Sequence, residues 1–126
     1  MKYLLDTHAF LWWMTAPERL PRTVVGLMQS DPGVIAFSSI SAWEMAIKTS
    51  LGKLKGVPLQ DLPGEVKAQG WQRLPFTTDH AVRVADLPAY HGDPFDRALI
   101  AQAMVEDLVL LSADVALKQY DIRTIW

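Results

Sequence analysis

The fold is decided by a stretch near the start of the chain, KYLLDTHAFLWWM, residues 2–14. Residues 2–5 form an apolar run that ends at Asp6, which is typical of a buried strand that stops at a polar residue. Residues 9–14 are apolar on nearly every side, which predicts a well-buried helix. A strand followed at once by a buried helix indicates the first half of a βαβ unit.

The same alternation of strand and helix patterns continues along the rest of the chain. Further strands are expected at 34–37, 71–74, 108–111 and 122–125, and further helices at 21–30, 42–51, 58–70, 77–87, 94–105 and 113–119. Alternating elements of this kind favour a mostly parallel sheet, whose right-handed crossovers place helices on both faces. We therefore expect a single α/β domain that spans residues 1–126.

The composition excludes several classes of protein. Hydrophobic residues make up 50% of the chain and charged residues 21%, which is the range of ordinary globular domains and not of disordered chains. The chain contains no cysteine, which rules out a disulfide scaffold, a thiolate zinc site and a cysteine nucleophile. A net charge of −2 argues against binding of nucleic acid through bulk positive charge, so such binding would need a local patch or metal ions.

The apolar N-terminus is neither a signal peptide nor a membrane span. A span needs about 20 consecutive apolar residues, and Asp6 and His8 interrupt this stretch much earlier. We therefore expect a soluble cytoplasmic protein.

Three of four acidic residues are placed where α/β proteins build their sites, at or shortly beyond the carboxyl end of a strand. Asp6 ends the first strand, and Asp114 follows the strand at 108–111. Glu44 lies on the helix after the second strand, and Asp96 lies one turn into a later helix. Carboxylates gathered in one cleft repel one another and are costly to desolvate, and a divalent cation removes that penalty. Oxygen ligands suit Mg²⁺ or Mn²⁺, which can activate water and hold a phosphodiester, so the four acids predict phosphodiester hydrolysis.

Each acid also has a structural explanation. Asp6 and Asp114 could cap the helices that follow them. The pattern Ser41-x-x-Glu44 matches a capping box. Asp96 could interact with the dipole of its helix, and Asp93 is expected to be the N-cap of that helix, contributing to the site only indirectly. The joint placement of the four acids, rather than any single one, therefore favours a metal site.

Three further polar residues lie close to these acids along the chain. His8 could contact a phosphate or a water on the metal, or it could simply fill the first helical turn. Lys48 lies one turn beyond Glu44 on the same helix face, where it could meet RNA. Arg97, beside Asp96, could bind a phosphate or could equally pair with an acid of the cluster.

The remaining histidines and the paired tryptophans suggest structural roles. His80 is expected to be a surface residue of a helix, and His91 is a loop residue without an assignable role. The histidines lack the spacing of a zinc site. Trp12 and Trp13 could stack on bases, but on a nearly all-apolar helix they favour a core or subunit contact.

Other chemistries that use this layout lack their motifs. A phosphatase of the haloacid-dehalogenase type needs a second Asp two residues after the first, and His8 stands there instead. The chain has no Gly-rich phosphate loop with Lys-Ser/Thr, no G-x-G-x-x-G after the first strand and no G-x-S-x-G elbow.

Four motifs, taken together, resemble those of the PIN-domain family. They are YLLDTHAFLWW at 3–13, SISAWE at 39–44, DPFDRALIAQA at 93–103 and LLSAD at 110–114. They occur in family order and spacing and extend over essentially the whole chain. The resemblance is to the branch that contains the VapC-type toxins of bacterial toxin–antitoxin pairs.

This resemblance implies a three-layer α/β/α sandwich around a parallel sheet of about five strands. It also implies a Mg²⁺- or Mn²⁺-dependent endoribonuclease that acts on RNA and is inhibited by a cognate VapB-type antitoxin. The family commonly forms homodimers, and the Trp12–Trp13 region is a candidate contact. Two alternatives stay open: a catalytically weak PIN-fold module that binds a partner, and a small metal-dependent phosphatase.

The resemblance also implies roles for individual residues. The family's acidic quartet, which holds the metal and carries catalysis, falls on Asp6, Glu44, Asp96 and Asp114. Ser112 falls where the family often has a Ser or Thr near the metal. Some members carry a further acid shortly after the last of the quartet, a position that is apolar here, so the number of metal ions stays open.

Overall fold

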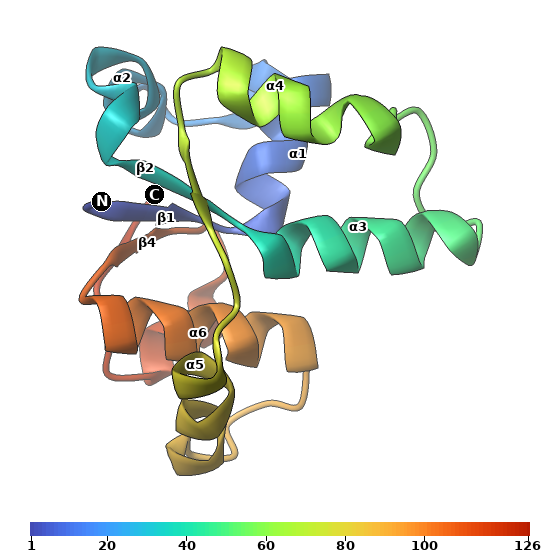
Figure 1. The fold of residues 1–126 in the computed structure, drawn as a ribbon. Coiled ribbons are helices and arrows are strands. Elements are labelled where there is room, and N and C mark those ends of the chain that lie inside the picture. Colours follow the sequence, from blue (N-terminus) through green and yellow to red (C-terminus); the bar gives the residue numbers. More distant parts are fainter.

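Five parallel strands form one sheet, in the order β3-β2-β1-β4-β5, in the computed structural model of residues 1–126 (Figure 1). The strands are β1 (Tyr3–Leu5), β2 (Ile35–Ser38), β3 (Gln72–Leu74), β4 (Val109–Leu111) and β5 (Thr124–Ile125). The central strand is β1, in which Leu4 is opposite Ala36 of β2 and Leu110 of β4. The predicted parallel sheet of about five strands is confirmed.

Six α-helices connect the strands and cover both faces of the sheet. They are α1 (Thr7–Thr15), α2 (Arg22–Ser30), α3 (Ser39–Ser50), α4 (Leu62–Ala68), α5 (Thr78–Arg83) and α6 (Pro94–Glu106). Figure 1 shows α1, α2 and α4 on one face, α5 and α6 on the other, and α3 running outward from the end of β2 between these layers. This arrangement confirms the expected α/β/α sandwich. None of the helices has the length and apolar character that crossing a membrane requires.

The alternation of side chains along β1 divides the core into two apolar clusters, one on each face of the sheet. Successive residues of a strand point to opposite faces. Leu4 accordingly packs with Leu99 and Ile100 of α6, whereas Leu5 packs with Phe10 of α1 and Met28 of α2. Because β1 is covered on both sides, its sequence is apolar at every position until Asp6.

Helix α3 begins three residues earlier than expected, at Ser39 instead of Ala42. The reason is that Ser38 is the N-cap, and its Oγ accepts a hydrogen bond from the Ile40 N–H at 3.0 Å. The Ser41-x-x-Glu44 capping box is therefore wrong, because Glu44 lies in the second turn and not at the third position of the helix.

Other boundaries differ because short 3₁₀ turns replace α-helix. The helices expected at 58–70 and 77–87 are each shorter, with 3₁₀ turns at 59–61 and 84–86. The segment expected to be a short helix at 113–119 is a 3₁₀ helix over Val115–Gln119. Boundaries of this kind depend on tertiary packing more than on local helix propensity.

His80 is fully buried, so the expectation of a surface histidine is wrong. Its Nδ1 accepts a hydrogen bond from the Thr77 N–H at 3.0 Å, and its Nε2 lies 2.9 Å from Glu106 Oε1. Thr77 and His80 form a reciprocal capping box at the start of α5, and this turns the ring toward α6. His80 therefore fastens α5 to the end of α6.

Candidate active site

Asp6 lies in the turn between β1 and α1, at the centre of the carboxyl edge of the sheet. It stands at the N-cap of α1, but its side chain makes no capping hydrogen bond, so the structural explanation does not account for the carboxylate. Its Oδ2 accepts a hydrogen bond from Ser112 Oγ at 2.7 Å. Its Oδ1 is buried without any hydrogen-bond partner. A buried carboxylate oxygen left in this state is costly unless something else binds it.

Ser112 connects Asp6 with Asp114 across the end of β4. The Ser112 hydroxyl donates to Asp6 and accepts a hydrogen bond from the Asp114 N–H at 3.1 Å. The Asp114 carboxylate accepts from the Ala116 N–H at 2.9 Å, so it caps the 3₁₀ helix that follows, as its structural explanation proposed. It is nevertheless exposed and borders the same surface depression as Asp6.

Glu44 reaches the site from the second turn of α3 and is 2% exposed. Its Oε2 accepts a hydrogen bond from Lys48 Nζ at 2.6 Å, whereas its Oε1 is buried and has no partner. The hydrogen bond to Glu44 raises the pKa of Lys48 above its usual value. The ammonium group expected to meet RNA is thus already bonded to an acid of the cluster.

Asp96 lies in the first turn of α6, and Asp93 is the N-cap of this helix as expected, since its Oδ1 accepts from the Asp96 N–H at 2.9 Å. Burial raises the pKa of Asp96 to about 6, and the charges of Asp93 and Asp6 add to this effect. His91 opposes the rise, with its Nε2 3.4 Å from Asp96 Oδ2. The Nδ1 of the same ring lies 2.6 Å from the Tyr120 hydroxyl, which holds the imidazole in place.

Three of the four acids act on one another electrostatically. Burial raises the pKa of Asp6, the hydrogen bond from Ser112 opposes this rise, and the charge of Glu44 adds to it. The charges of Asp6 and Glu44 likewise raise the pKa of Asp96. Carboxylates from three different elements therefore lie near enough to one another to share one region of negative potential.

The oxygen donors at this edge fit a hard divalent cation. Asp6 Oδ1 and Glu44 Oε1 are among four buried side-chain polar atoms in the protein that have no hydrogen-bond partner. The side chains do not form a ready-made cage, because no three His, Asp or Glu groups stand close enough to hold one ion together. Mg²⁺ commonly keeps several waters and contacts only one or two carboxylates directly, so the fit is to a hydrated ion.

The two remaining predicted site residues differ in their position. His8 is exposed, and its ring borders the depression beside Asp6. Arg97 points elsewhere, because its guanidinium donates to Pro88 O at 2.8 Å, to Leu87 O at 3.3 Å and to the Tyr120 hydroxyl at 3.1 Å. Arg97 thus fixes the loop before α6, and the structure does not bring it to the acids.

Sequence reasoning missed two features of this edge. His91 was without an assignable role, and no local signal connects it with Asp96. Trp43 is 55% exposed, and its ring packs edge-on against Phe95 at 5.1 Å between centroids. Each of these aromatic residues directly precedes an acid of the cluster, a signal that the sequence does contain.

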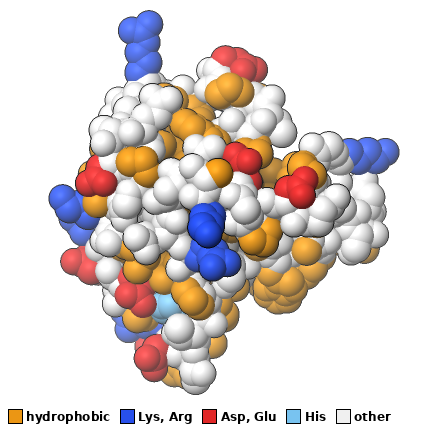
Figure 2. Space-filling model, turned by 45° about the horizontal axis from the view of Figure 1, so that its top comes forward, with side chains coloured by type: hydrophobic (Ala, Val, Ile, Leu, Met, Phe, Trp, Pro, Cys, Tyr) orange, Lys and Arg blue, Asp and Glu red, His pale blue; other side chains and the backbone are white.

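On the face of the molecule shown in Figure 2, positive charge does not gather into one large patch. Lys and Arg side chains there are scattered among acidic and hydrophobic ones. This distribution agrees with the net charge of −2 and leaves local groups as the source of any attraction for an anionic polymer.

Solved structures with the same fold include two VapBC structures bound to DNA. VapBC2 from Rickettsia felis, bound to a DNA fragment from its promoter, matches with a TM-score of 0.74 and 15% sequence identity, covering 99% of this chain and 98% of that one. DNA-bound VapBC from Salmonella typhimurium matches with a TM-score of 0.73 and 15% identity, covering 99% of this chain and 97% of that one. At such identities the likeness concerns the fold alone.

The sequence is similar to a curated protein and matches a family model. Ribonuclease VapC22 from Mycobacterium tuberculosis (strain ATCC 25618 / H37Rv) is 28% identical over 123 residues, which cover 93% of this chain and 90% of that protein. The family model described as the PIN domain matches residues 3–123, which include all four acids at the carboxyl edge. The chain belongs to the PIN domain family.

Proposed function

We propose that this protein is a Mg²⁺- or Mn²⁺-dependent endoribonuclease, the toxin of a type II toxin–antitoxin system. The observation that carries this proposal is the pair of buried carboxylate oxygens, on Asp6 and Glu44, that have no partner within the protein. The similarity to Ribonuclease VapC22 along nearly the whole chain supports RNA as the substrate.

The roles of the site residues follow from their contacts. Asp6, Glu44 and Asp96 are proposed to hold the ion, directly or through water, with Asp114 completing the site beside Asp6. When bound, the ion would activate water and neutralise charge on the phosphoryl oxygens, which is the chemistry of phosphodiester hydrolysis. Ser112 orients Asp6 by donating to its Oδ2, and this leaves Oδ1 free.

Residues around Asp96 keep that carboxylate in place. Asp93 fixes the first turn of α6 through the Asp96 N–H, and His91 contacts the carboxylate from the preceding loop. Arg97 holds this loop through its backbone carbonyls. Such supporting contacts orient the ligand groups of metal sites and influence their affinity.

A VapB-type antitoxin is the proposed partner. Two solved structures with this fold are VapBC complexes, and the curated relative is a VapC protein. We propose that the antitoxin covers the carboxyl edge and that the toxin forms a homodimer in the cytoplasm.

Cleavage of RNA under defined metal conditions tests the enzymatic part of the proposal. The wild-type protein should cut single-stranded RNA in Mg²⁺ or Mn²⁺, and it should not cut in EDTA. Asp6→Asn should be inactive in all three conditions. The products should carry 5′-phosphate and 3′-hydroxyl ends, because attack by water does not use the 2′-hydroxyl.

Three results would contradict this proposal: cleavage that persists in EDTA, cleavage by Asp6→Asn, or products with 2′,3′-cyclic phosphate ends. Hydrolysis of a soluble phosphomonoester without cleavage of RNA would favour a phosphatase instead. Binding of a partner protein without either activity would favour a PIN-fold binding module.

Growth after induced expression tests the toxin role. Expression without a partner should slow growth, Asp96→Ala should relieve the effect, and co-expression of a short neighbouring reading frame that encodes the antitoxin should also relieve it. Equal toxicity of the wild type and Asp96→Ala would count against a nuclease toxin.

A further inference from the structure

The neighbouring residues Trp12 and Trp13 face different surroundings. Trp13 packs edge-on against the buried ring of Trp71 at 5.7 Å between centroids. Trp12 instead lies 5.4 Å from the ring of Trp126 and 5.9 Å from the ring of His8, and with Asp6, His8 and Asp114 it borders the depression at the carboxyl edge. Both tryptophans are partly buried against the same apolar cluster, but of the two only Trp12 borders the depression beside the acids.

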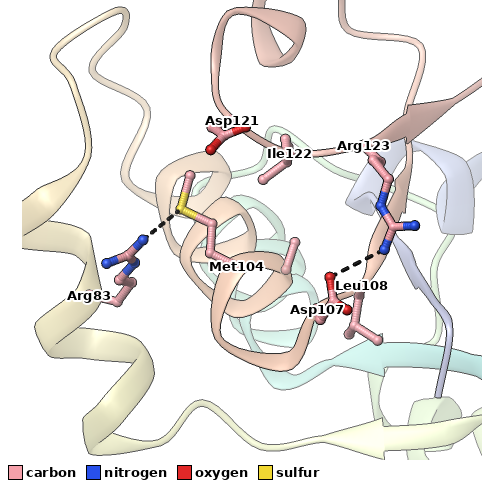
Figure 3. Close-up of a pocket in the computed structure, with 8 residues that line it drawn as sticks. Arg83, Met104, Asp107, Leu108, Asp121, Ile122 and Arg123 are labelled. Atoms are coloured by element: carbon pink, nitrogen blue, oxygen red, sulfur yellow. Dashed lines mark hydrogen bonds and ion pairs between the residues drawn. The ribbon is translucent and has the colours of Figure 1, made fainter.

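A cation is held over the Trp12 ring. The guanidinium carbon of Arg19 lies 5.0 Å from the ring centroid, within the range of a cation–π contact. Arg19 is exposed and makes no salt bridge and no side-chain hydrogen bond. Figure 3 shows the contrast at the other end of the sheet, where Arg123 is paired with Asp107. Arg19 is thus a positive charge over the Trp12 ring that is paired with no acid.

The basic residues on the helices that carry Glu44 and Asp96 are not available to bind RNA. The chain is net negative, Lys48 is bonded to Glu44, and Arg97 is occupied by backbone carbonyls. When a phosphodiester of an RNA strand reaches the carboxylates, the nucleotides on either side of it contact the residues that border the depression. Aromatic rings and Arg side chains are the groups that bind single-stranded RNA, by stacking on bases and by contact with phosphates.

We infer that Trp12 and Arg19 form a subsite for single-stranded RNA, in which Trp12 stacks on an unpaired base next to the scissile phosphate and Arg19 contacts an adjoining phosphate. The position of the scissile phosphate rests on the proposed function. Binding at Trp12 and Arg19 itself requires no metal, which separates the two hypotheses experimentally.

Binding of a fluorescein-labelled single-stranded oligoribonucleotide of mixed sequence, measured by anisotropy in EDTA and low salt, tests the subsite. Trp12→Leu should weaken binding on the order of tenfold, since stacking on one aromatic ring contributes that much. The matched control is Trp13→Leu, which removes the neighbouring ring that faces Trp71. Circular dichroism checks that both variants are folded.

Arg19→Gln provides a test that does not depend on packing in the core. It should weaken binding and reduce the slope of log K against log salt by about 0.7, as the loss of one phosphate contact does for single strands. Trp12→Leu should leave that slope unchanged. Arg22→Gln, a change at a nearby exposed arginine without an aromatic partner, should bind as the wild type does.

Four results would overturn the inference. These are wild-type affinity in both Trp12→Leu and Arg19→Gln, equal losses in the matched controls, no RNA binding by the wild type in EDTA, or a change in oligomeric state with unchanged RNA binding. The last result would identify Trp12 as a subunit contact. If the wild type cleaves RNA with metal but Trp12→Leu and Arg19→Gln bind RNA as the wild type does, the proposed function stands and the inference is wrong. If these two variants bind RNA more weakly but no protein cleaves it, the inference stands and the proposed function is wrong.

Discussion

The two ends of α6 carry aspartates in opposite situations. Asp96, at the start, has a side chain that is only 20% exposed, and burial raises its pKa to about 6. Asp107, just past the end, is 93% exposed and pairs with Arg123 at 3.2 Å. Without an added cation, the negative charge of Asp96 is unfavourable in the folded protein, whereas that of Asp107 is not. The two ends thus differ in electrostatic cost: a largely buried carboxylate with a raised pKa marks the start of α6 as the candidate site, whereas an exposed ion pair such as Asp107–Arg123 contributes little to stability.

The same contrast holds for the two edges of the sheet. The amino edge has a hollow of about 430 Å³, lined in part by Met104, Ile122 and the pair Arg123–Asp107 (Figure 3). The depression beside Asp6 at the carboxyl edge is smaller, at about 280 Å³. The size of a hollow therefore does not single out the acids, whereas the unpartnered carboxylate oxygens point to the depression beside Asp6 as the candidate site.

Replacing the aspartate at each end of α6 with asparagine should give the largest difference in the rate of RNA cleavage. Asp96→Asn should reduce RNA cleavage by more than the roughly 10- to 100-fold typical of residues that only support metal ligands. Asp107→Asn should cleave at the wild-type rate, because Asn tolerates the left-handed backbone that Asp107 adopts, with φ 52°. Initial rates at saturating Mn²⁺ measure both, and equal losses would break the comparison.

Removing the Ser112 hydroxyl should have the next largest effect. Ser112→Ala leaves both oxygens of Asp6 without a hydrogen-bond partner and also removes the acceptor of the Asp114 N–H. We expect cleavage to fall about 10- to 100-fold. The wild-type rate in Ser112→Ala would show that the hydroxyl does not orient Asp6 for catalysis.

The pH dependence of cleavage should report Asp96. Metal binding needs the ionised carboxylate, whose pKa is raised to about 6. At limiting Mn²⁺, activity should therefore fall about tenfold between pH 7.5 and pH 5, because only about a tenth of a group with this pKa is ionised at pH 5. Higher Mn²⁺ should shift the profile to lower pH. A profile that is flat down to pH 5 at limiting metal would contradict this assignment.

Stability without metal should show the smallest of these effects. The pKa of Asp96 is 3.8 in the unfolded chain and is raised to about 6 in the folded protein. The protonated carboxyl therefore contributes its full stabilisation below pH 3.8, and this stabilisation is lost as the pH rises through about 6. In EDTA at pH 7, Asp96→Asn should therefore be about 1–3 kcal/mol more stable than the wild type, a rise of several degrees in Tm. Asp107→Asn should change the free energy of unfolding by less than about 0.5 kcal/mol. At pH 4, calorimetry should find the same Tm for Asp96→Asn and the wild type.

Much of the fold was predictable because its signals are local. Apolar runs such as residues 3–5 and 108–111 identify buried strands, and alternation with helices leaves a parallel sheet as the consistent arrangement. The rule that sites lie at the carboxyl ends of strands then selects Asp6 and Asp114. The role of Glu44 was harder to predict, because Ser41-x-x-Glu44 also matches a capping box. The start of α3 at Ser39 excludes that structural explanation.

Features that depend on tertiary packing were not predictable. His80 is polar and lies on a short helix, yet the contact with Glu106 buries it. Arg97 follows Asp96 directly, but its position on α6 directs it to the carbonyls of the preceding loop. The different surroundings of Trp12 and Trp13 depend on how α1 packs on the sheet, which periodicity does not reveal on a helix that is apolar almost all round.

The central position of β1 determines when the carboxyl edge can be assembled during synthesis. Asp6 directly follows β1, which is synthesised before the other four strands of the sheet, but the hydroxyl that orients it follows β4, 106 residues later. Domains begin to fold from the N-terminus during synthesis, and contacts between distant residues form late. A growing chain that has not reached Ser112 therefore lacks both the hydroxyl that orients Asp6 and Asp114, so the carboxyl edge is assembled only when synthesis of the chain is nearly finished.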